Sequence, residues 1–385
     1  MKNKTDFENV WSKKIIDDLG SDRYQKLFSQ TNEGVKISPF YTRDRKSIIN
    51  PNDYLIPKKW NILYDINCVN SYDLTEEIKN LIKNEIINIC LTGFDEKLYQ
   101  ILIKKFKYSK VNFYFKSSEI PNFDFKNIKN FHLLIEPSLE VNQKSDFKNL
   151  ISKRKFKLNF SSKYLKNSGA NIVQEIAFIL SAANEYLKIY GKEISKNISF
   201  EVVQGENYFF EIAKIQSLRI LWSLITKKYG NQVDDCIVTA TPTIKNKTIK
   251  NFNNNIIRST TECMSGILGG CDFIKSIPYD FFNKNKNSFS ERIMYNQLLI
   301  LRNETFINKT INPISGSYYI SYLIDDLSEK SLDLFKKIES KGGYFNNLKE
   351  NGLFKQIFEN AKKENDQYKS NEKIQVGVNK YVDEL

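Results

Sequence analysis

Apolar residues recur along the chain at spacings that alternate between those of strands and those of helices. Short apolar runs typical of buried strands occupy 60–66, 86–91, 111–115, 131–135, 156–162 and 198–203. Segments with apolar positions three and four residues apart lie among them, at 75–84, 96–106, 171–190 and 207–228. Strands that alternate with helices are typical of a parallel sheet with right-handed crossovers. The pattern therefore predicts an α/β fold.

The stretch 252–319 shows this alternation most clearly. Ile257, Thr261, Met264 and Leu268 form one stripe at helical spacing, and Gly269-Gly270 is a typical helix stop. A short strand is expected at 272–277. A second helix should begin near Ser290, and Gly316 should turn the chain into a third. We expect helix, strand, loop and helix, as in a βα repeat.

Four separated words in this stretch resemble the methylmalonyl-CoA mutase family. They are Asn254 to Glu262 (NNIIRSTTE), Leu268-Gly269-Gly270, Ser290 to Ile293 (SERI) with Asn296-Gln297, and Pro313 with Gly316 to Tyr319 (GSYY). Four words in the right order and at the right spacing are far more specific than any one alone. The resemblance implies a TIM (β/α)8 barrel, the fold through which this family threads coenzyme A. About 250 residues suffice for such a barrel, so it fits within the 385 of this chain.

Further words extend the resemblance over most of residues 5–382, strongest from 198 to 343 and weakest from 90 to 155. Thr31 to Thr42 (TNEGVKISPFYT) resembles the signature that precedes the barrel in both subunit types of the family. Gln174 to Phe178 and Asn207 to Lys214 resemble two helix words, although Ser162-Lys163-Tyr164 stands where the family has Gly-Tyr-His. We expect an N-terminal helical arm at 1–50 that contacts a partner subunit, the barrel at 51–345, and a C-terminal helical extension at 346–385.

The residues that the resemblance implies for catalysis are missing. Family members that catalyse use a histidine before an H-x-Q-T-S-G word, an arginine in a G-T-x-Q-N-D-I word and a tyrosine near the first strand. An ungapped alignment places Thr239 at the histidine position, and threonine lacks the reach of an imidazole. The arginine word is absent, with Ile135 to Ser138 roughly in its place. Tyr54 lies near the tyrosine position, but alignment on Trp60 puts Leu55 there.

No residue is therefore predicted to be catalytic, to bind a cofactor or to bind a metal. Asn255, Arg258, Arg292 and Tyr318 are the positions that match family words. The structural interpretation of such an arginine is a buried guanidinium paired with a carboxylate such as Glu262, and it competes with a functional one.

The cobalamin-binding module that the family carries at its C-terminus is also absent. Its D-x-H-x-x-G word does not occur, and Val376 to Tyr381 (VGVNKY) resembles the segment that closes the barrel region. The resemblance thus implies a small (beta), non-catalytic subunit, inactive alone, without the cobalamin-type domain. In the implied heterodimer, an isomerase of propionate metabolism, the large catalytic subunit holds adenosylcobalamin and interconverts methylmalonyl-CoA and succinyl-CoA.

Two alternatives stay open from the sequence. The chain could be a divergent acyl-CoA mutase barrel that works with a separate cobalamin-binding subunit. It could instead be a non-enzymatic assembly or protection factor for the mutase.

Composition changes this interpretation little. The net charge of +13 and the pI near 9.2 would ordinarily suggest nucleic acid, but the lysines are scattered and form no basic strip, so no nucleic-acid partner is expected. No apolar run approaches the roughly 20 residues that span a bilayer, and the N-terminus has no apolar leader, which predicts a cytoplasmic protein without a membrane partner. Five cysteines without CxxC spacing predict reduced core thiols, and the single histidine, His132, is expected to be structural.

Overall fold

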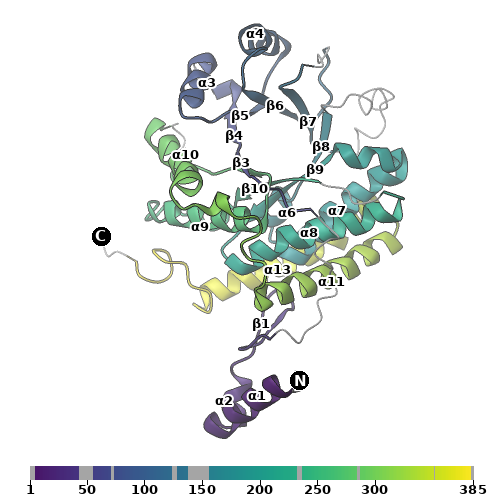
Figure 1. Cartoon of the computed structure of the whole chain (residues 1–385), viewed down its shortest axis with the longest axis vertical. Helices are drawn as coiled ribbons and strands as arrows, with labels where there is room; N and C mark the ends of the chain where they lie inside the picture. Colours follow the sequence, from purple (N-terminus) through teal and green to yellow (C-terminus); the bar gives the residue numbers. More distant parts are fainter. Residues whose placement is uncertain are drawn as a thin grey trace.

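A parallel sheet that closes on itself forms the centre of the molecule (Figure 1). The computed structural model describes residues 5–42, 55–70, 73–123, 128–137, 156–231, 236–283, 287–350 and 352–382. The strands of the sheet follow the order β3-β11-β10-β9-β8-β7-β6-β5-β4, and every pair in it is parallel. They are β3 (Asn61–Ile62), β4 (Tyr64–Asn67), β5 (Asn88–Thr92), β6 (Asn112–Ser117), β7 (Phe131–Ile135), β8 (Phe156–Ser161), β9 (Ile198–Gln204), β10 (Ile237–Pro242) and β11 (Phe273–Ile274).

The first and last strands of this order belong to one stretch of chain. Only Leu63 separates β3 from β4, yet β3 pairs with β11 whereas β4 pairs with β5. The two short strands therefore act as a single barrel strand that is hydrogen-bonded on both sides. The nine strands make eight barrel positions, and the predicted TIM barrel is confirmed.

Helices flank the barrel and follow the strands as the periodicity predicts. They are α3 (Leu74–Lys83), α4 (Glu96–Phe106), α6 (Lys163–Asn167), α7 (Ile172–Tyr190), α8 (Tyr208–Lys228), α9 (Asn254–Gly269), α10 (Ser288–Asn303), α11 (Tyr318–Ser340), α12 (Tyr344–Lys349) and α13 (Gly352–Lys369), with 3-10 turns η2 (Cys68–Asn70), η4 (Lys192–Asn197) and η5 (Ile307–Lys309). The ends of several of them are explained by local chemistry. Asn171 and Gln174 cap each other's backbone at the start of α7, and Gly270, at φ 89°, ends α9 in the left-handed conformation.

Helix α8, like α7, is buried along most of its length beside the sheet. It packs against α7, α9 and α11, and the side chain of Trp222 is fully buried with its ring 5.2 Å from that of Phe200 on β9. A helix with apolar residues on nearly every side needs neighbours on every side. The space between barrel and helices is therefore the main hydrophobic core.

Helix α9 is confirmed, but its apolar stripe is not its buried face. Ile257 is 67% exposed, whereas Asn255, Ser259 and Glu262 are fully buried. Hydrogen bonds satisfy these buried polar groups: Ser259 Oγ donates to the carbonyl of Asn255, and Gln297 Nε2 of α10 donates to Ser259 Oγ. A buried polar group with partners costs little, so the polar face can lie inward.

The N-terminal arm has two parts that differ in their contacts. Helices α1 (Thr5–Leu19) and α2 (Ser21–Gln25) stand away from the barrel (Figure 1). The following hairpin, β1 (Ser29–Gln30) with β2 (Lys36–Ile37), continues to Tyr41, which lies 5.0 Å from the rings of Tyr319 and Tyr322 on α11. The hairpin thus packs on the body of the protein, whereas the helices pack mainly on each other and on Phe40.

The C-terminal part begins with α13 and continues as an irregular segment. Ala361 of α13 lies directly against Gly169, whose φ of 106° and lack of a side chain allow the close approach. Residues 370–382 then cross the loops that follow β9 and β10, and the only β-bridge within them joins Val376 and Lys380. We call residues 370–382 the C-terminal strap.

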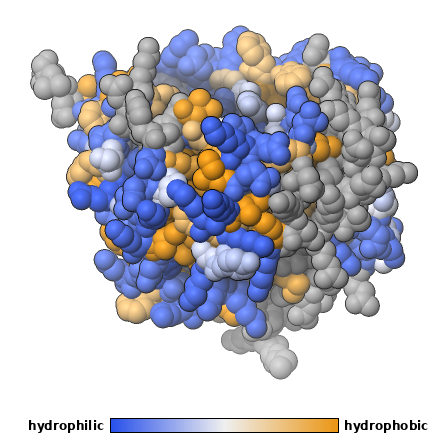
Figure 2. All heavy atoms as spheres, turned by 90° about the horizontal axis from the view of Figure 1, so that it is seen from above, coloured by the Kyte–Doolittle hydropathy of each residue, from blue (hydrophilic) through white to orange (hydrophobic). Residues whose placement is uncertain are grey.

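The surface and the cysteines agree with a water-exposed fold. Hydrophilic side chains cover most of the face seen from above, and hydrophobic ones show between them in patches (Figure 2). No helix in the described ranges has the length and apolar character needed to cross a bilayer. All five cysteines lie in the described residues and form no disulfide; four are buried, and burial raises the pKa of the Cys90 thiol to about 12.

Candidate functional site

The carboxyl ends of the barrel strands surround a cavity of about 1190 Å³. TIM barrels carry their active sites at this end, so it is the first place to look for chemistry. The cavity is lined by residues from seven of the eight barrel positions and from α6 and α10, including Asp65, Thr92, Lys116, Glu136, Lys163, Tyr164, Glu201, Thr241, Ser276 and Glu291.

A carboxylate lies at the floor of this cavity, inside the barrel. Glu201 of β9 is 3% exposed, and its oxygens lie 2.8 Å from Lys116 Nζ of β6 and 3.2 Å from Lys275 Nζ, just after β11. Asn159 Nδ2 and Thr241 Oγ1 donate to the same carboxylate. Because β6 and β11 are not neighbours of β9 in the sheet, these ion pairs join non-adjacent strands through the barrel interior.

Two further carboxylates complete this interior network. Lys116 Nζ is 2.8 Å from Glu136 Oε1, and Lys275 Nζ is 2.9 Å from Asp65 Oδ1. Burial would raise the pKa of Glu201, but Lys275 and Lys116 outweigh it and hold that pKa well below its usual value. Burial would lower the pKa of Lys275, yet Asp65 and Glu201 raise it well above its usual value. These two groups keep their charges near neutral pH, so neither is suited to general acid-base catalysis.

Aromatic rings from three strands form a second set of contacts inside the barrel. Tyr114 of β6 stacks on His132 of β7 at 4.8 Å, and its ring lies 5.4 Å from that of Phe273 on β11, across the axis. His132 is therefore a structural interior side chain. These rings and the interior network place side chains inside the barrel, beside the cavity, and Tyr114, His132 and Phe273 stay partly exposed there.

Thr239, at the family's histidine position, faces the barrel interior. Its neighbour Ala240 faces outward, since it lies against Gly266 of α9. Side chains alternate along a strand, so Thr239 points inward, at the level where β10 is paired with Glu201 and Phe273. The sequence alone shows that this position holds threonine and not histidine. The structure adds that Thr239 lies beside the interior network, level with Glu201.

Asn255 and Arg258 are brought together, and both bind backbone. Asn255 Nδ2 donates to the carbonyls of Thr248 and Tyr279, and its Oδ1 accepts from Arg258 Nη1 at 2.9 Å. Arg258 Nη2 donates to the carbonyl of Val376 in the C-terminal strap. The two family-motif residues thus connect α9 to a loop and to the strap.

The expected pairing of an arginine with Glu262 is not what the described residues show. Glu262 Oε2 lies 2.6 Å from Lys247 Nζ, and Asn246 Nδ2 donates to its other oxygen. Burial raises the pKa of Glu262 to about 7, although Lys247 and Asn246 act in the opposite direction. Lys247 and Glu262 are buried side by side, whereas the guanidinium of Arg258 donates to Thr248 Oγ1, Asn255 Oδ1 and the carbonyl of Val376.

The other two motif positions lie apart from this pair. Arg292 is exposed on α10 and lies over the ring of Phe289, with 5.4 Å to the ring centre. Tyr318 is half-exposed at the start of α11. Leu55 is exposed, and Tyr54 and Ser138 lie outside the described residues. The four motif residues do not form one site.

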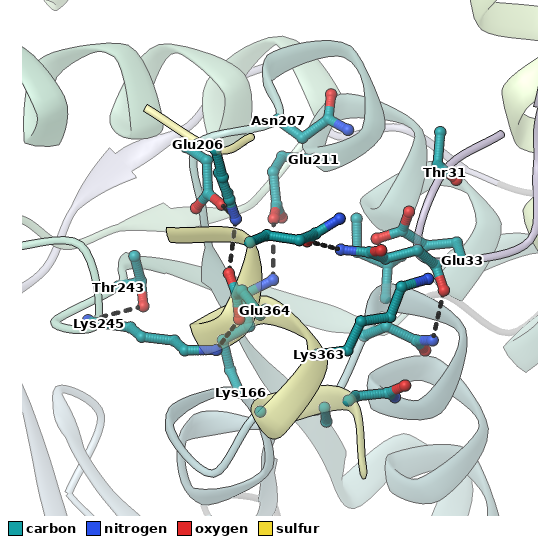
Figure 3. A pocket seen from close by; sticks show the side chains of 18 of the residues that line it. Thr31, Glu33, Lys166, Glu206, Asn207, Glu211, Thr243, Lys245, Lys363 and Glu364 are labelled. Carbon is teal, nitrogen blue, oxygen red and sulfur yellow. Dashed lines mark hydrogen bonds and ion pairs between the residues drawn. The ribbon is translucent and has the colours of Figure 1, made fainter. Parts of the chain in front are cut away.

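A second hollow, of about 450 Å³, lies where the arm hairpin, α6, α8 and α13 meet (Figure 3). Lys373 of the strap pairs with Glu206, which follows β9, and with Glu364 of α13 at 2.6 Å. Lys245, which follows β10, pairs with the other oxygen of Glu364. Each of these lysines has a carboxylate partner within the hollow, so the arrangement holds chain segments together rather than awaiting a charged ligand.

Below this hollow lies a buried group of two lysines and two glutamates. Lys166 Nζ is 3.2 Å from Glu175 and 3.4 Å from Glu211, and Lys214 is paired with both glutamates. Sequence reasoning missed these residues, although three of them are the charged letters within otherwise apolar helix words, Gln174 to Phe178 and Asn207 to Lys214. Charged residues inside strand runs, such as Glu201 in 198–203, were the corresponding signal for the interior network.

Comparison with known proteins agrees with this geometry. A family model described as Methylmalonyl-CoA mutase matches residues 135–385. A methylmalonyl-CoA mutase small subunit from Porphyromonas gingivalis is 39% identical over 144 residues, 36% of this chain and 23% of that protein. A large subunit from the same organism and a methylmalonyl-CoA mutase from Rhizobium meliloti are each 32% identical over 181 residues, 46% of this chain and 25% of theirs.

The matches therefore span about a quarter of the length of these curated relatives. The family model, in contrast, covers well over half of this chain and includes the four barrel strands β8 to β11 and all the words from Gln174 onward. This chain belongs to the methylmalonyl-CoA mutase family.

Proposed function

We propose that this chain is the small, non-catalytic subunit of an adenosylcobalamin-dependent methylmalonyl-CoA mutase. In this proposal it supports a large subunit that interconverts methylmalonyl-CoA and succinyl-CoA and holds the cofactor. The similarity to a small subunit at 39% identity supports the assignment, and that organism's large subunit supports a two-subunit arrangement.

The observation that carries the proposal is the set of ion pairs and ring contacts inside the barrel, at a site without the family's histidine. A thioester threaded through the barrel would meet the Lys116–Glu201–Lys275 pairs and the contact between Tyr114 and Phe273, and we propose that it would have to displace them. Breaking a buried ion pair by separating its partners costs several kcal/mol, about 3–5 in typical cases. A coenzyme A derivative would have to supply that free energy from its own contacts, and the groups that this family uses for those contacts are missing.

The residues present do not fit adenosylcobalamin either. The family ligand to cobalt is a histidine on a loop, and the whole sequence holds one histidine. That residue, His132, lies on strand β7 with its ring stacked on Tyr114. It cannot reach a cobalt ion without unstacking inside the barrel, so we derive no catalytic step through the cofactor in this chain.

Helices α1 and α2 of the arm are the part that we propose binds the large subunit. Phe7 is 75% exposed and Val10 is 61% exposed on a helix that stands away from the barrel. Trp11 stacks on Phe40 at 5.1 Å and gives this part a small core of its own. Apolar side chains on a projecting helix are typical of a segment that is covered in a complex.

Purification of the tagged chain from its native source, followed by mass spectrometry, tests the proposal. We expect the large mutase subunit in equal amount, and mutase activity in the complex that is absent from the separated small chain. Recovery with a separate cobalamin-binding protein and no large subunit would favour the divergent mutase instead. Recovery only with unassembled mutase would favour the assembly factor.

A further inference from the structure

The barrel cavity and the second hollow share two segments of chain as their common wall. The first is α6, where Tyr164 and Asn167 line the barrel cavity and Lys166 lines the hollow. The second follows β10, where Ile244 lines the cavity and Lys245 lines the hollow. A movement of either segment would therefore change the mouth of the barrel cavity.

The C-terminal helix α13 and the C-terminal strap support this wall from the side of the hollow. Glu364 of α13 pairs with Lys245 through one oxygen and with Lys373 through the other, the second pair at 2.6 Å. Figure 3 shows the side chain of Lys245 extended toward Glu364. One residue further along the wall, the carbonyl of Asn246 accepts from Gln375 Nε2 at 2.8 Å. The segment after β10 is thus held to the C-terminal part by side-chain contacts.

The strap is also held at α9, by a residue that matches a family word. Arg258 Nη2 donates to the carbonyl of Val376 at 2.7 Å. Thr248 and Asn255 exchange two hydrogen bonds, which fix the loop after β10 on the first turn of α9. The strap therefore spans from the wall of the cavity to α9, and the contacts at both places are polar.

Apolar burial contributes little to holding this C-terminal part. The structure describes all of residues 370–382, and their apolar side chains, Ile374, Val376, Val378, Tyr381 and Val382, are 43 to 69% exposed. Among the α13 side chains that the structure describes, Ile357 alone is buried. Segments with few buried apolar contacts and many partly exposed hydrogen bonds open at a lower free energy than the core does.

We propose that residues 352–382 act as a clasp, which opens as one unit while the barrel stays folded and which, when closed, fixes the mouth of the barrel cavity. In the closed state Glu364 holds the segment after β10 against α13. Opening would free that segment and α6 on the side of the hollow. The side chains of Lys245 and Lys373 are 31% and 27% exposed, so salt should weaken their pairs and favour opening. The clasp needs no partner subunit, so it holds or fails independently of the proposed function.

Hydrogen exchange of the full chain, read by mass spectrometry, tests the clasp. Glu364→Gln removes the charge that both lysines share and should speed amide exchange in 352–382 about threefold or more. Exchange in α6 and in 243–249 should rise with it, whereas exchange in β9 should change less than about twofold. Glu359→Gln, the same substitution at an exposed position of α13, is the control and should exchange as the wild type does.

Salt gives a second measurement that needs no substitution. Raising NaCl from about 0.1 M to about 1 M should speed exchange in 352–382 of the wild type, and less so in Glu364→Gln. An opening free energy for 352–382 equal to that of β9 would overturn the clasp, because the segment would then open only with the barrel. Faster exchange there without any change in α6 or 243–249 would overturn its control of the cavity mouth. Equal effects of Glu364→Gln and Glu359→Gln would overturn the role of the ion pairs.

Discussion

The barrel interior and the N-terminal helices differ in whether their side chains have partners within the chain. Inside the barrel, the buried Glu201 has two lysines and two hydrogen-bond donors, and rings close the space beside them. On α1, Phe7 and Val10 face outward although they are apolar. The interior charges are paired within the chain, whereas the arm presents apolar side chains that nothing in the described chain covers. Under the proposed function, this exposed surface is where the chain meets its partner.

The largest expected effect on stability comes from removing the charge of Glu201 inside the barrel. Glu201→Gln should lower the free energy of unfolding by about 3–5 kcal/mol at pH 7, because Lys116 and Lys275 lose a buried counter-charge. Denaturant unfolding measures the difference, and Glu359→Gln, an exposed change on α13, is the control and should stay within about 0.5 kcal/mol.

The pH dependence of the same variant sharpens the prediction. The pKa of Glu201 is depressed in the folded state, so its stabilisation is fully present above the unfolded value of 4.5 and is lost as pH falls through the folded pKa. The difference in unfolding free energy between wild type and Glu201→Gln should therefore be constant from pH 6 to 8 and become smaller only in acid. A difference that instead disappeared as the pH approached 8 would contradict the ion-pair account.

Two truncations of the N-terminal arm test the proposed role of its exposed helices. Removal of residues 2–26 should leave the melting temperature near that of the wild type but weaken binding to the large subunit by about a hundredfold or more. Removal of 2–45 should weaken binding as much, with the barrel still folded by circular dichroism. It should also lower the melting temperature, since it removes the buried Val35 and the contacts of Tyr41 with Tyr319 and Tyr322.

Pull-downs and melting curves on the same samples distinguish the alternatives. A 2–26 truncation that melts much lower but binds normally would mean that the helices support their own barrel. A truncation that is stable and also binds at full strength would mean that the arm neither supports the barrel nor binds the large subunit.

Replacing the two lysines and Glu201 of the interior network by apolar residues should cost much less than removing Glu201 alone. The triple variant Lys116→Met, Glu201→Leu and Lys275→Met should have an unfolding free energy within about 2 kcal/mol of the wild type, because the two carboxylates left behind, Glu136 and Asp65, reach solvent. The single variant Glu201→Leu is the matched comparison and should be the less stable protein. Equal losses in the two variants would show that packing, not charge, dominates this site.

The alternation of apolar runs predicted most of the fold, but not the pairing of charges. Local signals sufficed for α4, for the end of α9 at Gly270 and for the strands β7 and β9, because apolar period and capping chemistry act over a few residues. Lys116 and Glu201 are 85 residues apart in sequence, and Lys275 and Asp65 are 210 apart. Only barrel closure brings them together, so no local pattern could assign their partners.

For the candidate site, the sequence predicted which family residues are missing better than it predicted the contacts of the residues that are present. The resemblance identified Thr239 in place of a histidine, which needs no structure. The face of α9 that lies inward was not predictable from periodicity, because hydrogen bonds to Asn255, Ser259 and Gln297 replace apolar packing there. The choice of Lys247 over Arg258 as the partner of Glu262 depends on a loop whose path the sequence does not reveal.

The smallest expected effect is that of restoring one catalytic residue. Thr239→His should give no measurable mutase activity, because residues that act as a unit contribute little when the others are missing. It should also destabilise the fold by about 1–3 kcal/mol, since a larger ring replaces a buried threonine side chain. Turnover above that of the parent chain, in an assay with added adenosylcobalamin, would count against this interpretation.

The most direct test of the central claim is a titration of the isolated chain with adenosylcobalamin, followed by an assay with methylmalonyl-CoA. The account predicts an unchanged cobalamin spectrum and no succinyl-CoA, because His132 is stacked inside the barrel and Thr239 stands at the position of the family's histidine. A clear shift to the spectrum of histidine-ligated cobalamin, or turnover by the chain alone, would contradict it.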